Sequence, residues 1–259
     1  MSHAAPMVIR SRDNPLLVRL RRLAEEPKAY RRLEEIWLEG DHLCAALRQR
    51  GGQARQCVIA ESAWQQPSLR ELAGWATQVV IVSDALFDGV STLESSGKLG
   101  FLIARPSPAE ILPAVDSLVL DRLQDAGNVG SILRSAAAFG VVQVVALQGT
   151  AALWSPKVLR AAMGAHFGLR LIEGAQLDEL HALQVPWIGT SLSTNQALHE
   201  ATLPAPCAWL LGHEGQGLDP ALLARCNQVV RIPQPGGEES LNVAAAAAVC
   251  LYESMRRRA

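Results

Sequence analysis

The sequence has few of the residue patterns that hold metals or disulfide frameworks. Its five cysteines are scattered without a CxxC pair, and its six histidines form no HxxxH or HExxH pattern. Structural zinc sites and small disulfide-rich folds depend on such closely spaced side chains. We therefore expect no metal site, and we expect the thiols to be reduced, as in cytoplasmic proteins.

Long apolar segments are missing as well. No stretch reaches the roughly 18 apolar residues of a membrane-spanning helix, and the N-terminus lacks the charged and then apolar pattern of a secretory signal. The GxSxG elbow of serine hydrolases, the GxGxxG turn of dinucleotide-binding folds and the GxxxxGKS/T P-loop are also absent. The sequence thus predicts a cytoplasmic protein without a membrane partner, outside those three classes.

An excess of either charge is missing over the whole chain, whose net charge is −1. Residues 8–32 differ, because eight lysines and arginines stand there against three acids, a local excess of five positive charges. Such a basic segment can contact the phosphates of a nucleic acid. The alternative interpretation is an ordinary solvated helix face.

What is present is the composition of a packed protein, with 49% hydrophobic and 19% charged residues. Three prolines between residues 106 and 113 disfavour regular structure and are typical of a linker. We place a first domain at residues 1–110, a linker at 111–117 and a second domain at 118–259.

The first domain mixes helices with short apolar strands, which indicates a small α/β domain. Its expected helices are 13–24 and 41–50, and its expected strands are 36–39, 57–60, 79–82 and 99–104. In the second domain, continuous Val, Leu and Ile strands between helices predict a parallel sheet with helices on both faces. Its expected strands are 117–123, 141–147, 169–172, 187–189, 208–211 and 229–232, and its expected helices are 128–139, 155–164, 176–184, 219–226 and 240–257.

Polar residues follow three predicted strands of the second domain, at the strand ends where ligands of open α/β sheets bind. The first stretch runs from Asn128 to Arg134. Asn128 can be interpreted as a helix N-cap, whereas Arg134, on a helix rich in apolar side chains, needs a carboxylate, a phosphate or solvent. Because an arginine is not readily deprotonated, Arg134 could hold a phosphate and stabilise a developing alkoxide as a cation.

The second stretch is the glycine-rich turn 212–218, which follows an apolar strand. Glycine permits close approach of the backbone to a ligand, and Glu214 offers an acceptor, although such a turn can also be purely structural. The third stretch, residues 232–243, ends in a Ser-Leu-Asn-Val sequence at the start of an alanine-rich helix. Ser240 is an expected N-cap, and the amides of a helix N-terminus can serve a ligand at the same time.

The order and spacing of these three stretches resemble the SpoU (TrmH-like) family of RNA ribose 2′-O-methyltransferases, over residues 118–259. The resemblance implies S-adenosylmethionine as the cofactor and a structured RNA as the substrate, with rRNA favoured over tRNA. It also implies a homodimer and a deep C-terminal trefoil knot. Periodicity alone does not indicate a knot, since knots are very rare.

The resemblance further implies roles for individual residues. The catalytic set is Asn128, Arg134, Glu214, Ser240 and Asn242. The cofactor-binding set is Thr190, Ser191, Leu211, Gly212, Glu214, Gly215, Gly217, Ile232, Gln234, Ser240 and Leu241.

The first domain resembles, more loosely, the L30e-like RNA-binding domain that precedes many SpoU catalytic domains. Residues 11–15, Arg31 with Arg32, and residues 38–40 carry this similarity. It implies that the N-terminal domain binds the substrate RNA. The expected RNA-contacting set is Arg12, Asn14, Arg19, Arg31, Arg32 and Arg134.

Two residues depart from the family pattern. Gln234 stands where an apolar residue usually follows Ile-Pro, and Glu238 replaces a commonly apolar residue before Glu-Ser-Leu-Asn. These departures bear on cofactor affinity and substrate choice. Two alternatives stay open: a catalytically inactive RNA-binding protein that retains the fold, and a base methyltransferase of the same superfamily, like the TrmD-like enzymes.

Overall fold

The computed structural model describes residues 5–93, 97–236 and 240–258, and the chain forms two compact units. Unit 1 comprises Met1–Ser107 and Trp154–Phe167, and unit 2 comprises Pro108–Leu153 and Gly168–Ala259. The structure differs from the expected division in the segment 154–167. Its helix α8 (Pro156–Ala162) packs on α1 and β2 of unit 1, which the spacing of the sequence does not reveal.

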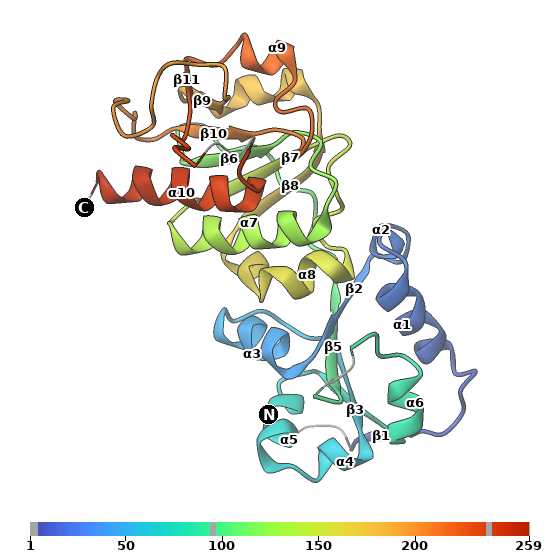
Figure 1. Cartoon of the computed structure of the whole chain (residues 1–259). Helices are drawn as coiled ribbons and strands as arrows, with labels where there is room; N and C mark the ends of the chain where they lie inside the picture. The colour runs from blue at the N-terminus through green and yellow to red at the C-terminus, as the bar shows by residue number, and fades with distance from the viewer. Residues whose placement is uncertain (1–4, 94–96, 237–239, 259) are drawn as a thin grey trace. The chain divides into compact units, whose positions relative to one another are not determined.

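Unit 1 is an α/β unit with a mixed five-stranded sheet in the order β1-β4-β3-β5-β2 (Figure 1). Its strands are β1 (Met7–Ile9), β2 (Glu35–Glu39), β3 (Gln56–Ala60), β4 (Gln78–Val82) and β5 (Leu99–Ala104). Its first helices are α1 (Pro15–Glu25), α2 (Ala29–Leu33), α3 (Asp41–Gln49), α4 (Glu61–Trp64), α5 (Pro67–Ala73) and α6 (Asp84–Asp88). The two pairings of β5, with β2 and with β3, are antiparallel, and the other pairings of these strands are parallel.

Helix α1 shows how local sequence sets an element of unit 1. The Asn14 side chain accepts a hydrogen bond from the Leu16 N–H at 2.9 Å, and Pro15 occupies the first helical position. Both features are typical of helix starts. The leucines of α1 then recur on one side and are buried against the sheet, whereas Arg22 is exposed and Arg19 and Arg21 are half-buried.

Unit 2 contains a six-stranded sheet in the order β11-β9-β10-β6-β7-β8, and every strand pair within it is parallel. The strands are β6 (Ser117–Leu120), β7 (Gln143–Leu147), β8 (Arg170–Ala175), β9 (Trp187–Thr190), β10 (Ala208–Leu211) and β11 (Gln228–Val230). This confirms the parallel sheet predicted from continuous apolar strands. Burial on both faces explains why these strands do not alternate with polar residues.

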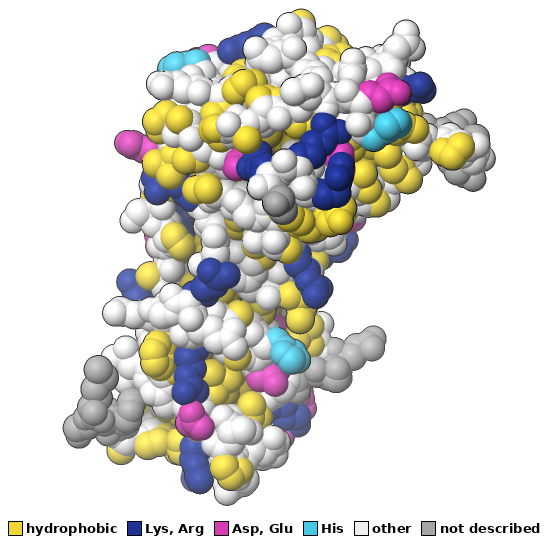
Figure 2. All heavy atoms as spheres, turned by 90° about the vertical axis from the view of Figure 1, so that its left-hand side faces the viewer, with side chains coloured by type: hydrophobic (Ala, Val, Ile, Leu, Met, Phe, Trp, Pro, Cys, Tyr) yellow, Lys and Arg dark blue, Asp and Glu magenta, His cyan; other side chains and the backbone are white. Residues whose placement is uncertain are grey.

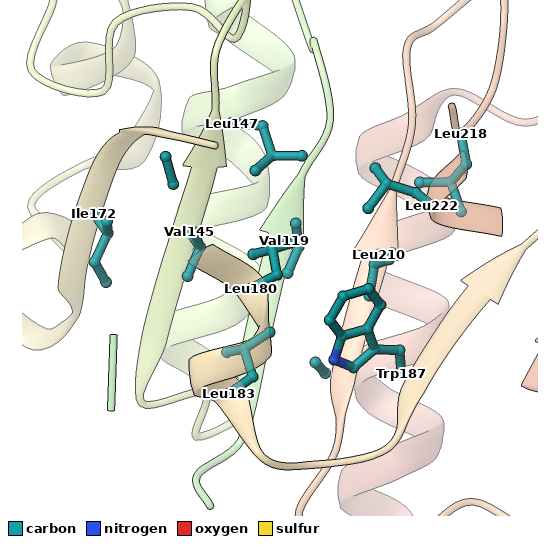
Figure 3. Packing of buried hydrophobic residues seen from close by; sticks show 12 residues of the cluster. Val119, Val145, Leu147, Ile172, Leu180, Leu183, Trp187, Leu210, Leu218 and Leu222 are labelled. Carbon is teal, nitrogen blue, oxygen red and sulfur yellow. The ribbon is translucent and has the colours of Figure 1, made fainter. Parts of the chain in front are cut away.

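Helices cover both faces of this sheet. The long helices α7 (Ala126–Ala138) and α10 (Val243–Arg256) lie side by side on one face (Figure 1). On the other face, leucines of the 3-10 helix η2 (Leu177–Leu183) and of α9 (Pro220–Leu223) pack on Val119, Val145 and Leu210 of the central strands (Figure 3). The remaining 3-10 helix is η1 (Ala165–Gly168), at the end of the α8 segment.

Two predicted helix caps are wrong. Helix α7 begins two residues before Asn128, because Asp125 accepts the hydrogen bond of the Asn128 N–H at 2.8 Å and is the N-cap. Helix α10 begins after Asn242, whose side chain accepts from the N–H groups of residues 244 and 245, so that Ser240 lies outside the helix. The segment expected as helix 176–184 forms a tighter 3-10 helix over Leu177–Leu183.

The C-terminal end of α10 is tied to the segments that precede β10 and β6. The Arg257 guanidinium donates to the carbonyls of Leu198 and His199, each at 3.0 Å, and Arg258 forms a bidentate ion pair with Asp116. These contacts hold the last helix against segments far from it in sequence. The trefoil knot of this region stays a prediction of the family resemblance.

No helix in the described part of the chain has the length and apolar character needed to cross a membrane. No cluster of three or more His, Cys, Asp or Glu side chains that could bind a metal ion occurs in residues 5–93, 97–236 and 240–258.

A buried hydrogen bond of 2.9 Å from Trp209 Nε1 of β10 to Ser254 Oγ of α10 holds this helix against the sheet. We expect Ser254→Ala to lower the free energy of unfolding by about 1–3 kcal/mol, because the indole N–H would stay buried without an acceptor. Urea unfolding measures this. The control Ser131→Ala, at an exposed position of α7, should change stability by less than about 0.5 kcal/mol. Equal, small effects of both substitutions would contradict the prediction.

Candidate cofactor and RNA site

A pocket of about 540 Å³ lies at the carboxyl edge of the parallel sheet in unit 2. Thr190 at the end of β9, Leu211 at the end of β10 and Val230 at the end of β11 all line it, together with the first turn of α10. Small-molecule sites commonly measure roughly 300–1,000 Å³ and lie at strand ends of parallel sheets. The pocket therefore has the place and size of a ligand site.

All eleven residues expected from the sequence to bind a cofactor line this pocket. They come from three segments that are separated by many residues in the chain, and parallel pairing of β9, β10 and β11 brings them together. The pocket also has lining residues that the sequence analysis did not identify: Leu192, Ser193, His213, Gln216, Leu218, Leu223, Val230, Arg231, Val243 and Ala246. Most of these residues are apolar and stand next to the motif residues in the sequence. Their residue types alone do not indicate a ligand site.

The glycine-rich turn after β10 folds back tightly on itself. A Cβ atom at Gly212 would lie 2.1 Å from the backbone nitrogen of Leu218, so no other residue fits there. His213 stabilises the turn, since its Nδ1 accepts from the N–H groups of Gly215 at 3.0 Å and Gln216 at 3.3 Å. The histidine is thus a structural part of the pocket wall.

Glu214 connects this turn to the loop before α7. Its carboxylate accepts hydrogen bonds from the backbone N–H groups of Gln124 at 3.3 Å and Asp125 at 3.1 Å, and from Asn128 Nδ2 at 3.3 Å. Burial raises the pKa of Glu214, but hydrogen bonds from its own backbone N–H, from Asp125 and from Asn128 outweigh it, so the pKa is lowered overall. The carboxylate is therefore a fixed, charged acceptor.

Asn128 and Asn242 extend this network to the third motif. The Asn242 Nδ2 group donates to Asn128 Oδ1 at 3.0 Å, while Asn242 Oδ1 caps α10. One chain of hydrogen bonds therefore runs from Asn242 through Asn128 to Glu214. The structure brings together one predicted catalytic residue from each of the three motifs.

A second anchor of the turn went unnoticed in the sequence. Asp121, at the end of β6, is buried and accepts from Arg122 at 2.8 and 3.0 Å and from the Asp219 N–H at 2.8 Å. The Arg122 guanidinium also reaches Gln216 Oε1 at 3.4 Å. The turn 212–218 is thus fixed to the loop that follows β6 at Gln216 and just after its end, at Asp219. The position of Asp121, an acid directly after an apolar strand, could have indicated this anchor from the sequence.

The remaining predicted residues of this site are placed as follows. Ser240 is exposed and lines the pocket. The Gln234 Oε1 atom is buried in the pocket wall without a hydrogen-bond partner in the described part of the chain. Glu238 lies outside the described residues. The Ser191 and Ser193 hydroxyls share a hydrogen bond of 2.8 Å, which shapes the loop after β9.

Arg134 does not line the pocket. Its side chain is exposed on α7 and has no ion pair with any described residue. Six residues along a helix correspond to about 9 Å of rise and about 120° of rotation from Asn128. Within one chain, Arg134 is thus a solvated cation on the helix that carries Asn128.

Most of the expected RNA-contacting side chains of unit 1 have partners within the unit. Arg19 pairs with Glu35 at 3.2 Å and Arg32 with Glu26 at 3.1 Å. The Arg31 Nε group donates to the Tyr30 hydroxyl at 3.0 Å, and Asn14 is the cap of α1, as described above. Arg12 is exposed. The structure does not gather these side chains into one unpaired cluster.

The Glu214 contacts predict a dependence on pH. Since the folded pKa of Glu214 is below its ordinary value of 4.5, the carboxylate contributes stability above that pH and loses it as the pH falls through the folded value. We expect Glu214→Gln to be less stable than the unsubstituted protein at pH 7, and the difference to shrink below pH 4.5. Thermal unfolding at stepped pH measures this, and a constant difference down to acid pH would contradict it.

Comparison with known proteins gives the same family from sequence and from structure. A sequence model of the SpoU rRNA Methylase family matches residues 117–252. An uncharacterized tRNA/rRNA methyltransferase of Synechocystis sp. is 34% identical, over 96% of this chain and 94% of that protein. The 23S rRNA (guanosine(2553)-2′-O)-methyltransferase RlmP of Bacillus subtilis is 31% identical, over 83% of this chain and 86% of that protein.

Solved structures match along almost the whole chain. The crystal structure of an RNA 2′-O ribose methyltransferase has a TM-score of 0.81 and 30% identity, covering 97% of this chain and 99% of that one. The SpoU methyltransferase AviRb from Streptomyces viridochromogenes, solved with AdoMet, has a TM-score of 0.85 over 95% of this chain and 98% of that one, and at 22% identity it supports the fold alone. With a family model that matches more than half of its length, this chain belongs to the SpoU rRNA methylase family.

Proposed function

We propose that this protein transfers a methyl group from S-adenosylmethionine to a ribose 2′-hydroxyl of a structured RNA, with 23S rRNA the favoured substrate. The observation that carries the proposal is the hydrogen-bonded chain Asn242–Asn128–Glu214 beside the pocket. The 23S rRNA specificity named for RlmP of Bacillus subtilis supports the class of RNA. A ribosomal substrate implies action in the cytoplasm.

The pocket residues fit the proposed cofactor. Apolar side chains such as Leu192, Leu218 and Ile232 provide surfaces for a purine ring, and the hydroxyls of Thr190 and Ser191 provide polar partners. The buried Gln234 Oε1 accepts no hydrogen bond from a described residue, and a bound ligand would supply the missing donor. Bound S-adenosylmethionine would supply an electrophilic methyl group on its sulfonium.

The chain's own residues would position the RNA and stabilise charge. Ser240, exposed at the pocket, would contact the ribose, and the Asn128–Asn242 pair would hold the start of α10 in place. Arg134 would bind an RNA phosphate and stabilise the oxygen that loses its proton, because a guanidinium stays charged. Positioning and electrostatics would then account for most of the rate.

A homodimer would complete the site. Helix α10 exposes Val249 at 41% and Tyr252 at 48% of their surface. Phe139, directly after α7, meets the Tyr252 ring edge-on, with 5.9 Å between the ring centroids. Apolar side chains so exposed on packed helices suit a contact with a second copy. Since Arg134 of α7 does not line the pocket of its own chain, we assign it to a partner's pocket in this dimer.

The function is tested by incubating the full-length protein with labelled S-adenosylmethionine and rRNA from cells that lack it, followed by mapping of the methyl group. Label on one ribose 2′-oxygen would support the proposal. Label on a base would identify a base methyltransferase instead. Cofactor and RNA binding without any transfer would identify an inactive RNA-binding protein that retains the fold.

For Arg134→Ala, we expect turnover to fall by roughly 100-fold or more, because a charge-stabilising group is lost. The dissociation constant for S-adenosylmethionine should stay nearly unchanged, since Arg134 does not line the pocket. Arg134→Lys should retain part of the activity, because it keeps the charge but not the planar fork. Calorimetry and single-turnover assays separate the two effects. Equal losses of cofactor binding and turnover would contradict the assignment of Arg134 to the RNA rather than to the cofactor.

For Val249→Glu, we expect a monomer in light scattering after size exclusion, because a carboxylate would be buried without a partner in the dimer. Val8→Glu is the matched control, since Val8 is 52% exposed on β1 of unit 1 and far in sequence from α10. The control should keep the oligomeric state of the unsubstituted protein. A Val249→Glu protein that stays dimeric would exclude this face of α10 as the contact.

A further inference from the structure

Unit 1 holds a tryptophan on its surface in a fixed orientation. Trp75, directly after α5, exposes 44% of its surface. Its indole N–H donates to the Gly52 carbonyl at 2.8 Å, so the ring is anchored rather than free to fold inward. Large aromatic side chains usually bury most of their surface. A fixed, exposed indole is therefore an unused stacking surface.

Two loops run together around this ring. The Thr77 N–H donates to the Ala54 carbonyl at 3.0 Å, and the Gln78 N–H donates to the Arg55 carbonyl at 3.2 Å. The loop 50–55 before β3 and the loop 74–78 before β4 thus form one continuous edge at the start of two neighbouring parallel strands. Side chains from both loops belong to the same surface.

This edge carries positive charge without nearby acids in its own loops. Arg50 and Arg55 are exposed, and neither forms an ion pair with a described residue. Arg48 lies over the Trp75 ring at 5.8 Å from its centroid and pairs with Glu71 at 2.9 Å. No acid occurs between residues 50 and 60 or between residues 72 and 83.

The basic segment 8–32 differs from this edge, because it does not combine unpaired positive charge with an exposed aromatic ring. In that segment, Arg19 and Arg32 are paired with acids and Arg31 with a tyrosine. Arg10, Arg12, Arg22 and Lys28 are exposed there, but the aromatic side chain of the segment, Tyr30, is buried. Figure 2 shows basic and apolar side chains, with some acidic ones, interspersed on the face of unit 1 that includes α3 and α5, on the left of Figure 1. Unstacked RNA bases bind aromatic rings, and their phosphates bind arginines.

We propose that Trp75, with Arg48, Arg50 and Arg55, forms an RNA-contacting surface of unit 1, named here the Trp75 surface. A base of a single-stranded segment stacks on the open face of the Trp75 ring, and Arg50 and Arg55 contact the flanking phosphates. The inference rests on the proposed function for the choice of RNA as partner. It assigns substrate recognition to the loops before β3 and β4 rather than to the segment 8–32.

The first test compares Trp75→Phe with Trp75→Leu in the full-length protein. Phenylalanine keeps an aromatic face and leucine keeps only apolar bulk, and both lose the bond to Gly52. We expect Trp75→Leu to bind a fluorescein-labelled, mixed-sequence RNA dodecamer roughly 5- to 100-fold more weakly than Trp75→Phe, by fluorescence anisotropy, because one base stack is lost. Equal affinities of the two variants would overturn the proposal.

The second test uses charge. Each phosphate contact to a single strand contributes about 0.7 to the slope of log K against log salt concentration. The double variant Arg50→Gln/Arg55→Gln should therefore reduce this slope by about 1.4. The charge-matched control Arg10→Gln/Arg22→Gln, at exposed positions of the segment 8–32, should leave the slope unchanged. An equal reduction in both double variants would indicate diffuse electrostatic attraction and overturn the assignment.

Controls separate this inference from the proposed function. The dodecamer assay needs no cofactor, and S-adenosylmethionine binding by calorimetry should be the same in all four variants because none of the changed residues lines the pocket. Absence of methyl transfer by the unsubstituted protein would contradict the enzyme activity alone. Unchanged RNA binding in Trp75→Leu and in Arg50→Gln/Arg55→Gln would contradict the Trp75 surface alone, and would leave a protein partner as its occupant.

Discussion

The arrangement of the site depends on the Glu214 carboxylate, which accepts three hydrogen bonds. Two come from backbone N–H groups of the loop before α7, and one comes from the Asn128 side chain. Since Asn128 in turn accepts from Asn242, one ionised group holds the glycine-rich turn, the start of α7 and the start of α10 in register. A carboxylate with several donors is strongly favoured in its charged form, which makes this junction rigid.

This junction can form because the sheet behind it is buried on both faces. α7 and α10 pack on one face, and η2 and α9 cover the other. Parallel strands bring their carboxyl ends to the same edge, so segments after β9, β10 and β11 meet without any local sequence signal between them. The ties from Arg257 and Arg258 hold the far end of α10 as well. The pocket walls are thus fixed from both ends.

In unit 1, the number of basic residues in a segment differs from the number of positive charges that a ligand can reach. The segment 8–32 has a local excess of five positive charges, yet two of its arginines, Arg19 and Arg32, are neutralised by acids brought close by folding. Arg50 and Arg55 stand in a less conspicuous part of the sequence and stay exposed. Exposed ion pairs contribute little stability, but they do remove charge that a phosphate would otherwise meet.

The amino-acid sequence alone determined the parallel sheet of unit 2 and the strand ends that carry its three motifs, because these follow from local apolar patterns and glycine positions. The eleven residues expected to bind the cofactor, all of which line the pocket, came from the resemblance of those motifs to the SpoU family. The sequence did not determine which residues cap α7 and α10, since Asp125 and Asn128 are equally good caps locally. It also missed Asp121 and the membership of α8 in unit 1. Those outcomes depend on contacts between residues far apart in the chain, such as Asn128 and Glu214, which are 86 positions apart. Only the packed tertiary structure brings such residues within hydrogen-bonding distance and decides which donor each acceptor receives.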